Sequence, residues 1–167
     1  QPALNYGYYK KEYSWQFDYK DERLSALHNK VVDIMKFWLD KGVDGFRCDM
    51  ASSIVKNDVS GQGSCEIWRK LFGEVRKSYP QAIFISEWGQ PEYAVGSGAF
   101  DIDFFTHCYN DGYNNLFRKE SGCNIFDSSG DSYFRKGGKG ECKTFFEYLE
   151  HNLSKVKDNG YVSVVSG

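Results

Sequence analysis

The sequence predicts an α/β protein in which parallel strands alternate with helices. Two stretches carry this prediction, residues 42–53 and 82–89, because each holds a short apolar run that ends in an acidic residue. A segment with the apolar spacing of a helix precedes the first stretch, and another lies between the two. A strand, a crossover helix and a second strand form a parallel pair. With 167 residues, the chain has the size of one domain.

The composition is that of a globular protein, with 41% hydrophobic and 26% charged residues. Aromatic residues make up 17%, a share that fits carbohydrate binding by ring stacking and fits an aromatic core equally well. The net charge of -2 offers no basic surface, so we expect no nucleic acid partner. No apolar run approaches the roughly 18 residues of a membrane span.

The five cysteines, at positions 48, 65, 108, 123 and 142, show no CxxC or mixed Cys/His spacing. A zinc site is therefore not expected, and the odd number argues against a dense disulfide framework while leaving one bridge open. The chain does not begin with Met and shows no signal peptide, so we expect it to be part of a longer polypeptide.

Residues 1–20 have no regular period and are expected to form a loop. Seven aromatic residues either offer a surface for sugar stacking or anchor this loop to the next helix. The anchor is favoured, because an unpacked aromatic patch is a liability for a soluble protein. The seven are Tyr6, Tyr8, Tyr9, Tyr13, Trp15, Phe17 and Tyr19.

A helix is predicted over residues 22–41, with Asp21 as its N-cap and Gly42 after its end. His28 lies one position off the apolar face, and a solvated or capped histidine is expected there rather than a catalytic one. The apolar face consists of Leu24, Leu27, Val31, Ile34, Met35 and Trp38.

The strand that follows, at 43–49, ends in Arg47 and Asp49. Strand side chains alternate between two faces, so these two project together. At the carboxyl end of a parallel strand such residues usually serve a site. The alternative is a plain surface ion pair, which contributes little.

A loop is expected up to about residue 63, followed by a helix that ends by Tyr79 and Pro80. The apolar face of this helix consists of Ile67, Trp68, Leu71, Phe72 and Val75.

The run at 82–89 predicts a buried parallel strand that delivers Glu87 to its carboxyl end. An unpaired carboxylate is costly to bury, so Glu87 should face a cleft. The alternative is a glutamate that merely flanks a loop.

The remaining chain predicts a strand at 100–104, a helix at about 105–118, an irregular loop at 120–140, a helix at about 141–158 and a strand at 161–167. For Asp101 and Asp103 a strand-end turn is favoured over the alternative, contact with substrate. His151 is expected in solvent. The last helix should bury Phe145, Phe146, Leu149, Leu153 and Val156.

Two of these stretches resemble the α-amylase family, glycoside hydrolase family 13. GFRCD, residues 45–49, is similar to the second conserved stretch of that family, Gly-Phe-Arg-x-Asp, and ISEW, residues 85–88, is similar to the third. The resemblance implies a fragment of a (β/α)8 TIM barrel, from about the third helix through the seventh strand. Residues 1–167 would then be a partial catalytic domain.

The resemblance also implies roles for single residues. Asp49 would be the catalytic nucleophile, Glu87 the general acid/base, and Arg47 the residue that holds Asp49. We expect Arg47 and Trp88 to contact the substrate. The family commonly has a histidine where this chain has Ser53. Its third catalytic carboxylate would lie beyond Gly167, so we expect the 167 residues alone to be inactive.

The chemistry of the two acids supports the same function. Carboxyl groups at the ends of neighbouring strands share one rim of a sheet, and a pair about 5 to 5.5 Å apart performs retaining glycoside hydrolysis. Arg47 should keep Asp49 charged, while apolar neighbours such as Trp88 should raise the pKa of Glu87.

The sequence thus predicts a retaining α-glycoside hydrolase that acts on α-glucans or α-glucosides, with an oligosaccharide or polysaccharide as its substrate. Two alternatives stay open: a non-catalytic relative that binds carbohydrate or protein through the same fold, and an unrelated parallel α/β enzyme. Many family members hold a structural calcium, but no metal site is identifiable in this segment.

Overall fold

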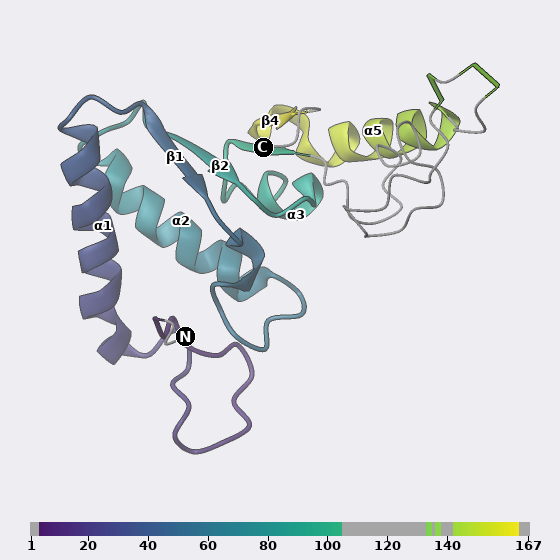
Figure 1. Ribbon diagram of the computed structural model, residues 1–167. Coiled ribbons are helices and arrows are strands. Elements are labelled where there is room, and N and C mark those ends of the chain that lie inside the picture. The colour runs from purple at the N-terminus through teal and green to yellow at the C-terminus, as the bar shows by residue number, and fades with distance from the viewer. Residues whose placement is uncertain (1–3, 105–132, 135, 138–141, 164–167) are drawn as a thin grey trace.

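The computed structural model describes residues 4–104, 133–134, 136–137 and 142–163. Its centre is a parallel sheet with the strand order β1-β2-β3-β4, shown in Figure 1. The strands are β1 (Gly45–Cys48), β2 (Ile83–Ser86), β3 (Ile102–Phe104) and β4 (Tyr161–Ser163). Consecutive strands are neighbours and run in the same direction, as the alternation of strands and helices predicted.

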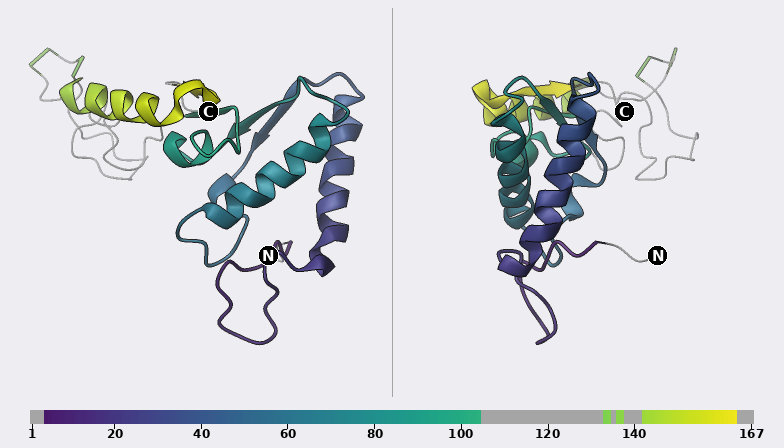
Figure 2. Two further views of the ribbon diagram at one scale, coloured as in Figure 1. Left: turned by 180° about the vertical axis from the view of Figure 1, so that it is seen from behind. Right: turned by 90° about the vertical axis from the view of Figure 1, so that its left-hand side faces the viewer.

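Helices connect the strands. Glu22–Leu24 forms the 3-10 helix η1, which leads into α1 (Ser25–Leu39), and Asp21 caps η1 by accepting a hydrogen bond from the backbone N–H of Arg23. The short helix η2 (Ala51–Ser53) and α2 (Gln62–Arg76) lie between β1 and β2, and α1 packs against α2. The views in Figures 1 and 2 show α1 and α2 side by side next to β1 and β2.

The core lies between α2 and the sheet. The predicted apolar face of α2 is buried throughout, and the ring of Phe72 stacks on that of Phe84 in β2, with centroids 3.7 Å apart. Phe100 and Trp68 add edge contacts to this cluster. The large aromatic share of the sequence is therefore used in part to fill the core.

The buried face of α1 differs from the predicted one. Of the predicted residues, Leu24 and Met35 are buried but Ile34 and Trp38 are about half exposed. Val32 and Leu39, which were not predicted, are buried as well. His28 belongs to the buried face, with 3% of its surface exposed, so the expectation that it lies in solvent is wrong. The imidazole packs against the ring of Tyr6, and its Nδ1 lies 3.3 Å from Nζ of Lys70 on α2.

The later part of the chain adds α3 (Pro91–Ala94), α5 (Cys142–Val156) and η3 (Lys157–Asn159). The expected face of α5 is confirmed in part, because Phe145 and Val156 are buried but Phe146 and Leu153 are about half exposed. His151 is exposed, as expected, and its Nε2 lies 3.0 Å from Glu92. The predicted helix at 105–118, most of the loop at 120–140 and the end of the last strand lie outside the described residues.

Within the described residues, no helix has the length and apolar character needed to cross a membrane. Cys48, Cys65 and Cys142 are free thiols.

Candidate active site

The two predicted acids follow immediately after neighbouring strands. In the register of β1 and β2, Cys48 pairs with Ser86, so Asp49 and Glu87 come next on each strand at the same level. The backbone N–H of Glu87 donates to the carbonyl of Cys48 at 2.9 Å, which fixes the two strand ends to each other. The carboxyl ends of both strands therefore bring the two side chains to one place.

Arg47 connects both acids. Its Nη1 lies 2.6 Å from Oδ1 of Asp49, and its Nη2 lies 2.6 Å from Oε1 of Glu87. Alternation along β1 accounts for the contact with Asp49, and the register between strands accounts for the contact with Glu87. The sequence predicted the first contact. The second requires knowledge of which strands are neighbours and was not predicted.

The other oxygen of Glu87 is held by the backbone. Oε2 accepts a hydrogen bond from the N–H of Met50 at 2.9 Å. Met50 has φ 46, in the left-handed region that residues with a side chain rarely adopt. The neighbours expected for Glu87 were apolar, yet both of its oxygens contact polar groups.

The pKa of Asp49 lies below its usual range. The larger cause is a hydrogen bond with the side chain of Glu87, and the next is the hydrogen bond from Arg47. Asp49 is largely exposed, so a charged carboxylate there meets solvent on its open side.

A buried carboxylate shapes the loop after Glu87. Asp103 in β3 has no exposed surface, and it accepts hydrogen bonds from three consecutive backbone N–H groups. The distances are 3.3 Å for Trp88, 3.2 Å for Gly89 and 2.9 Å for Gln90. Burial raises the pKa of Asp103, and the hydrogen bonds oppose this shift. The strand-end turn expected for Asp103 is wrong, since its side chain lies inside the protein and fixes the neighbouring loop.

Asp101 serves the structure at the other end of β3. Its carboxylate pairs with Arg76 of α2 at 2.6 Å and accepts the N–H of Phe84 at 2.8 Å. It is thus bound by α2 and β2 and takes no part in the site.

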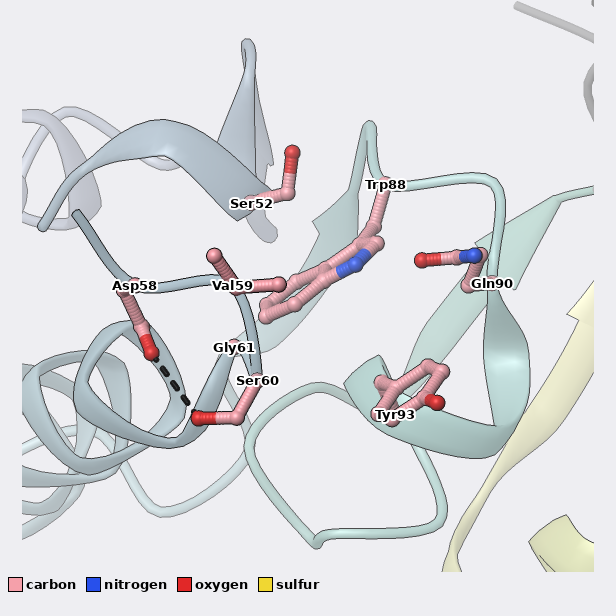
Figure 3. Close-up of a pocket in the computed structure, with 8 residues that line it drawn as sticks. All are labelled: Ser52, Asp58, Val59, Ser60, Gly61, Trp88, Gln90 and Tyr93. Atoms are coloured by element: carbon pink, nitrogen blue, oxygen red, sulfur yellow. Dashed lines mark hydrogen bonds between the residues drawn. The ribbon is translucent and has the colours of Figure 1, made fainter. Parts of the chain in front are cut away.

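A cavity of about 270 Å³ lies between the loop after β1 and the loop after β2, as Figure 3 shows. The indole of Trp88 lies between the side chains of Val59 and Gln90 in that view. Gly61 lets the indole approach, because a Cβ at Gly61 would lie 2.5 Å from Cζ2 of Trp88. The cavity is lined by Ser52, Asp58, Val59, Ser60, Gly61, Trp88, Gln90 and Tyr93.

Ser53 does not face this cavity. Its hydroxyl donates to the carbonyl of Met50 at 3.0 Å within the turn of η2. Among the described residues, no group of three or more His, Cys, Asp or Glu side chains is placed to hold a metal ion.

Parallel strands with crossover helices and a pair of acids at adjacent strand ends define an enzyme-type α/β fold, the arrangement found in (β/α) barrels. Residues 5–90 match the family described as alpha amylase, catalytic domain. This match spans more than half of the chain, and the chain therefore belongs to the α-amylase family.

Relatives with known names agree with this assignment. Alpha-amylase 3 of Dictyoglomus thermophilum is 30% identical over 69 residues, which are 41% of this chain and 13% of that protein. Oligo-1,6-glucosidase of Parageobacillus thermoglucosidasius is 57% identical over 30 residues, 18% of this chain and 5% of that protein.

A solved structure shares the fold. Eubacterium rectale Amy13B superimposes with a TM-score of 0.56 at 16% identity, over 88% of this chain and 28% of that one. The fold is therefore a part of a TIM barrel, as predicted. The chain spans less than a third of this structure, and its matches span a smaller share still of the two named relatives.

Proposed function

We propose that this chain carries the catalytic centre of a retaining α-glycoside hydrolase that acts on α-glucans or α-glucosides. The observation that supports the proposal most is the pair of acids at the ends of β1 and β2, joined by Arg47. Family membership adds a carbohydrate substrate. The names of the two relatives refer to an amylase and a glucosidase, both of which cleave bonds between sugars.

In this proposal Asp49 is the nucleophile. One of its oxygens attacks the anomeric carbon of the sugar while the glycosidic bond breaks, and Glu87 gives its proton to the leaving oxygen. A covalent glycosyl ester on Asp49 results. Glu87 then takes a proton from water, the water oxygen attacks the anomeric carbon, and the ester bond breaks to return Asp49 as a carboxylate.

Arg47 and Trp88 are the residues we assign to substrate positioning. The guanidinium keeps Asp49 charged and, through its second contact, sets the distance between the two acids. Trp88, the residue after Glu87, forms one wall of the cavity and offers an apolar surface to a sugar ring.

The second part of the proposal concerns the chain by itself. Four parallel strands are described, and one edge of β1 has no strand beside it. A TIM barrel has eight strands, and its active site is built from several of them. We therefore propose that residues 1–167 form a partial catalytic domain and are inactive without further strands.

A non-catalytic relative that binds carbohydrate or protein through the same surface is the alternative. It is favoured by Ser53, which stands where the family commonly has a sugar-binding histidine and whose hydroxyl is engaged by the backbone.

Covalent labelling distinguishes these functions. The intact protein that carries these residues is treated with 5-fluoro-α-glucosyl fluoride, and the modified peptide is identified by mass spectrometry. We expect the label on Asp49, its loss in Asp49→Asn, and its retention in Asp44→Asn, because Asp44 is exposed and lies before β1. A protein that binds glucan but accepts no label at Asp49 would support the non-catalytic alternative.

A further inference from the structure

The aromatic loop at residues 6–19 divides into an anchored base and an exposed tip. At the base, Tyr19 is buried and its hydroxyl donates to Oε2 of Glu66 on α2 at 2.9 Å. The ring of Tyr9 stacks on Tyr19 with centroids 5.5 Å apart, and its hydroxyl donates to Gln62 at 2.9 Å. These two aromatic residues therefore anchor the loop, but to α2 and not, as was predicted, to the helix that follows the loop.

The tip has the opposite character. Tyr13 and Trp15 are 59% and 64% exposed, and their rings are nearly parallel, with an interplanar angle of 10° and centroids 5.9 Å apart. The two rings together form an exposed apolar surface at the tip.

The tip is held in place by polar contacts. Gln16 is buried, and its Oε1 accepts the backbone N–H groups of Glu12 at 2.6 Å and Tyr13 at 3.0 Å. The ring of Tyr8 meets Trp15 edge-on at 5.9 Å. Because the loop conformation is fixed in advance, a ligand that stacks on Tyr13 and Trp15 loses little ordering entropy of the protein.

The loop lies at the same end of the sheet as the candidate active site. The N–H of Tyr9 donates to the carbonyl of Lys56 at 2.8 Å, and the N–H of Lys56 donates to Gly7 at 3.0 Å. Lys56 belongs to the segment that follows β1. Figure 1 and the left view of Figure 2 show the loop protruding beyond the end at which β1 terminates.

We propose that Tyr13 and Trp15 form a second carbohydrate-binding surface, which takes up an α-glucan chain outside the catalytic cleft. This inference rests on the proposed function for the identity of the sugar. A pyranose presents an apolar C–H face, and the exposed parts of these two stacked rings offer an apolar surface on which such a face can pack. The surface holds a polymer near the acids and has no effect on a single glucose unit.

The test measures glucan binding and turnover in the intact protein. In a Glu87→Gln background, affinity for amylopectin is measured by affinity electrophoresis. We expect Tyr13→Ala/Trp15→Ala to weaken it about tenfold or more, and Tyr13→Phe/Trp15→Phe to keep most of it. With Glu87 present, the alanine variant should raise KM for amylopectin and leave kcat/KM for a nitrophenyl glucoside unchanged.

Phe37 and Trp38 provide the matched control. They form another exposed aromatic pair, 53% and 50% exposed, but on α1 and in an edge-to-face arrangement. Phe37→Ala/Trp38→Ala should bind amylopectin like the parent. Equal affinity in the two alanine variants would overturn the proposal, and so would unchanged glucan affinity with a lowered Tm in Tyr13→Ala/Trp15→Ala, since the rings would then be packed against other polypeptide.

The outcome for the catalytic proposal is separate. Glucan binding that depends on Tyr13 and Trp15, in a protein that hydrolyses nothing, would reject the hydrolase and keep the second surface. Hydrolysis of amylopectin with the same KM in the parent and in Tyr13→Ala/Trp15→Ala would support the hydrolase and reject the second surface.

Discussion

Nη2 of Arg47 lies 2.6 Å from Oε1 of Glu87, so an arginine at the end of β1 also holds the acid at the end of β2. The same guanidinium contacts Asp49 through its other terminal nitrogen. One planar group therefore sets the positions of both acids relative to each other.

Arg47→Lys should lower kcat by about 10- to 100-fold in the intact protein, because a lysine ammonium cannot hold both carboxylates in one fixed plane and the two acids would lose their relative position. Initial rates on an α-glucoside measure this effect. Arg69→Lys is the control, since Arg69 is exposed on α2 and donates to the carbonyl of Ser97. Equal losses in the two variants would contradict a bridging role.

The lowered pKa of Asp49 predicts how activity depends on pH. A nucleophile must be charged, so activity should persist below the usual aspartate pKa of about 3.9 and fall as the pH drops through the lowered value. Arg47→Met removes one of the causes and should move the acidic limb of the kcat/KM profile to higher pH. Circular dichroism at each pH separates this shift from unfolding. An acidic limb that stays in place would show that Arg47 does not control the charge of Asp49.

Asp103→Asn tests the carboxylate that orders the loop at 88–90. An asparagine keeps one acceptor oxygen but turns an NH2 group toward backbone N–H donors, which leaves buried groups without partners. We expect the free energy of unfolding to fall by about 2 to 3 kcal/mol. Calorimetry of the intact protein measures the change, with Asp44→Asn as the exposed control. Equal stability of the two variants would contradict the role given to Asp103.

Gly61 is the N-cap of α2 and Gly73 lies within this helix, so the two glycines make a matched pair. Gly61 has φ 70, and a side chain there would meet Trp88, whereas a Cβ at Gly73 meets nothing within 4 Å. Gly61→Ala should cost about 1 to 2 kcal/mol and displace the indole from the cavity wall, while Gly73→Ala should stabilise the helix by roughly 0.5 to 1 kcal/mol. Urea unfolding gives both values. If Gly73→Ala lowered the stability and Gly61→Ala left it unchanged, the contact between position 61 and Trp88 would not be what requires a glycine.

The parts of the fold that depend on local pattern could be predicted from the sequence. The alternation of strands and helices predicted the parallel sheet. The pattern of apolar runs that end in an acid predicted that Asp49 and Glu87 lie at the ends of neighbouring strands. The contact between Arg47 and Glu87 and the hydrogen bonds of Asp103 could not be predicted, because each joins a residue of one strand to the segment that follows the neighbouring strand. Both depend on register, which a single strand does not encode.

The buried face of α1 shows a second limit. Apolar residues occur on two adjacent stripes of this helix, one through Leu27 and Val31 and the other through Val32 and Leu39. Helical periodicity identifies the helix but cannot choose between neighbouring stripes when both are apolar. The choice is made by packing against α2. This choice placed His28 inside the protein and leaves Ile34 and Trp38 about half exposed.

Burial of His28 predicts a pH-dependent stability. Burial lowers its pKa below the usual 6.5, and the nearby charge of Lys70 lowers it further. The unfolded chain therefore binds a proton at a higher pH than the folded protein does. Stability should be complete above about pH 6.5 and should fall as the pH drops from there toward the lowered folded pKa.

His28→Leu removes this proton uptake. Urea unfolding at pH 5 and pH 7.5 should show a smaller difference in the free energy of unfolding for His28→Leu than for the parent. His151→Gln is the control, because His151 is exposed. If His28→Leu keeps the full difference between the two pH values, protonation of His28 is not what destabilises the protein in acid.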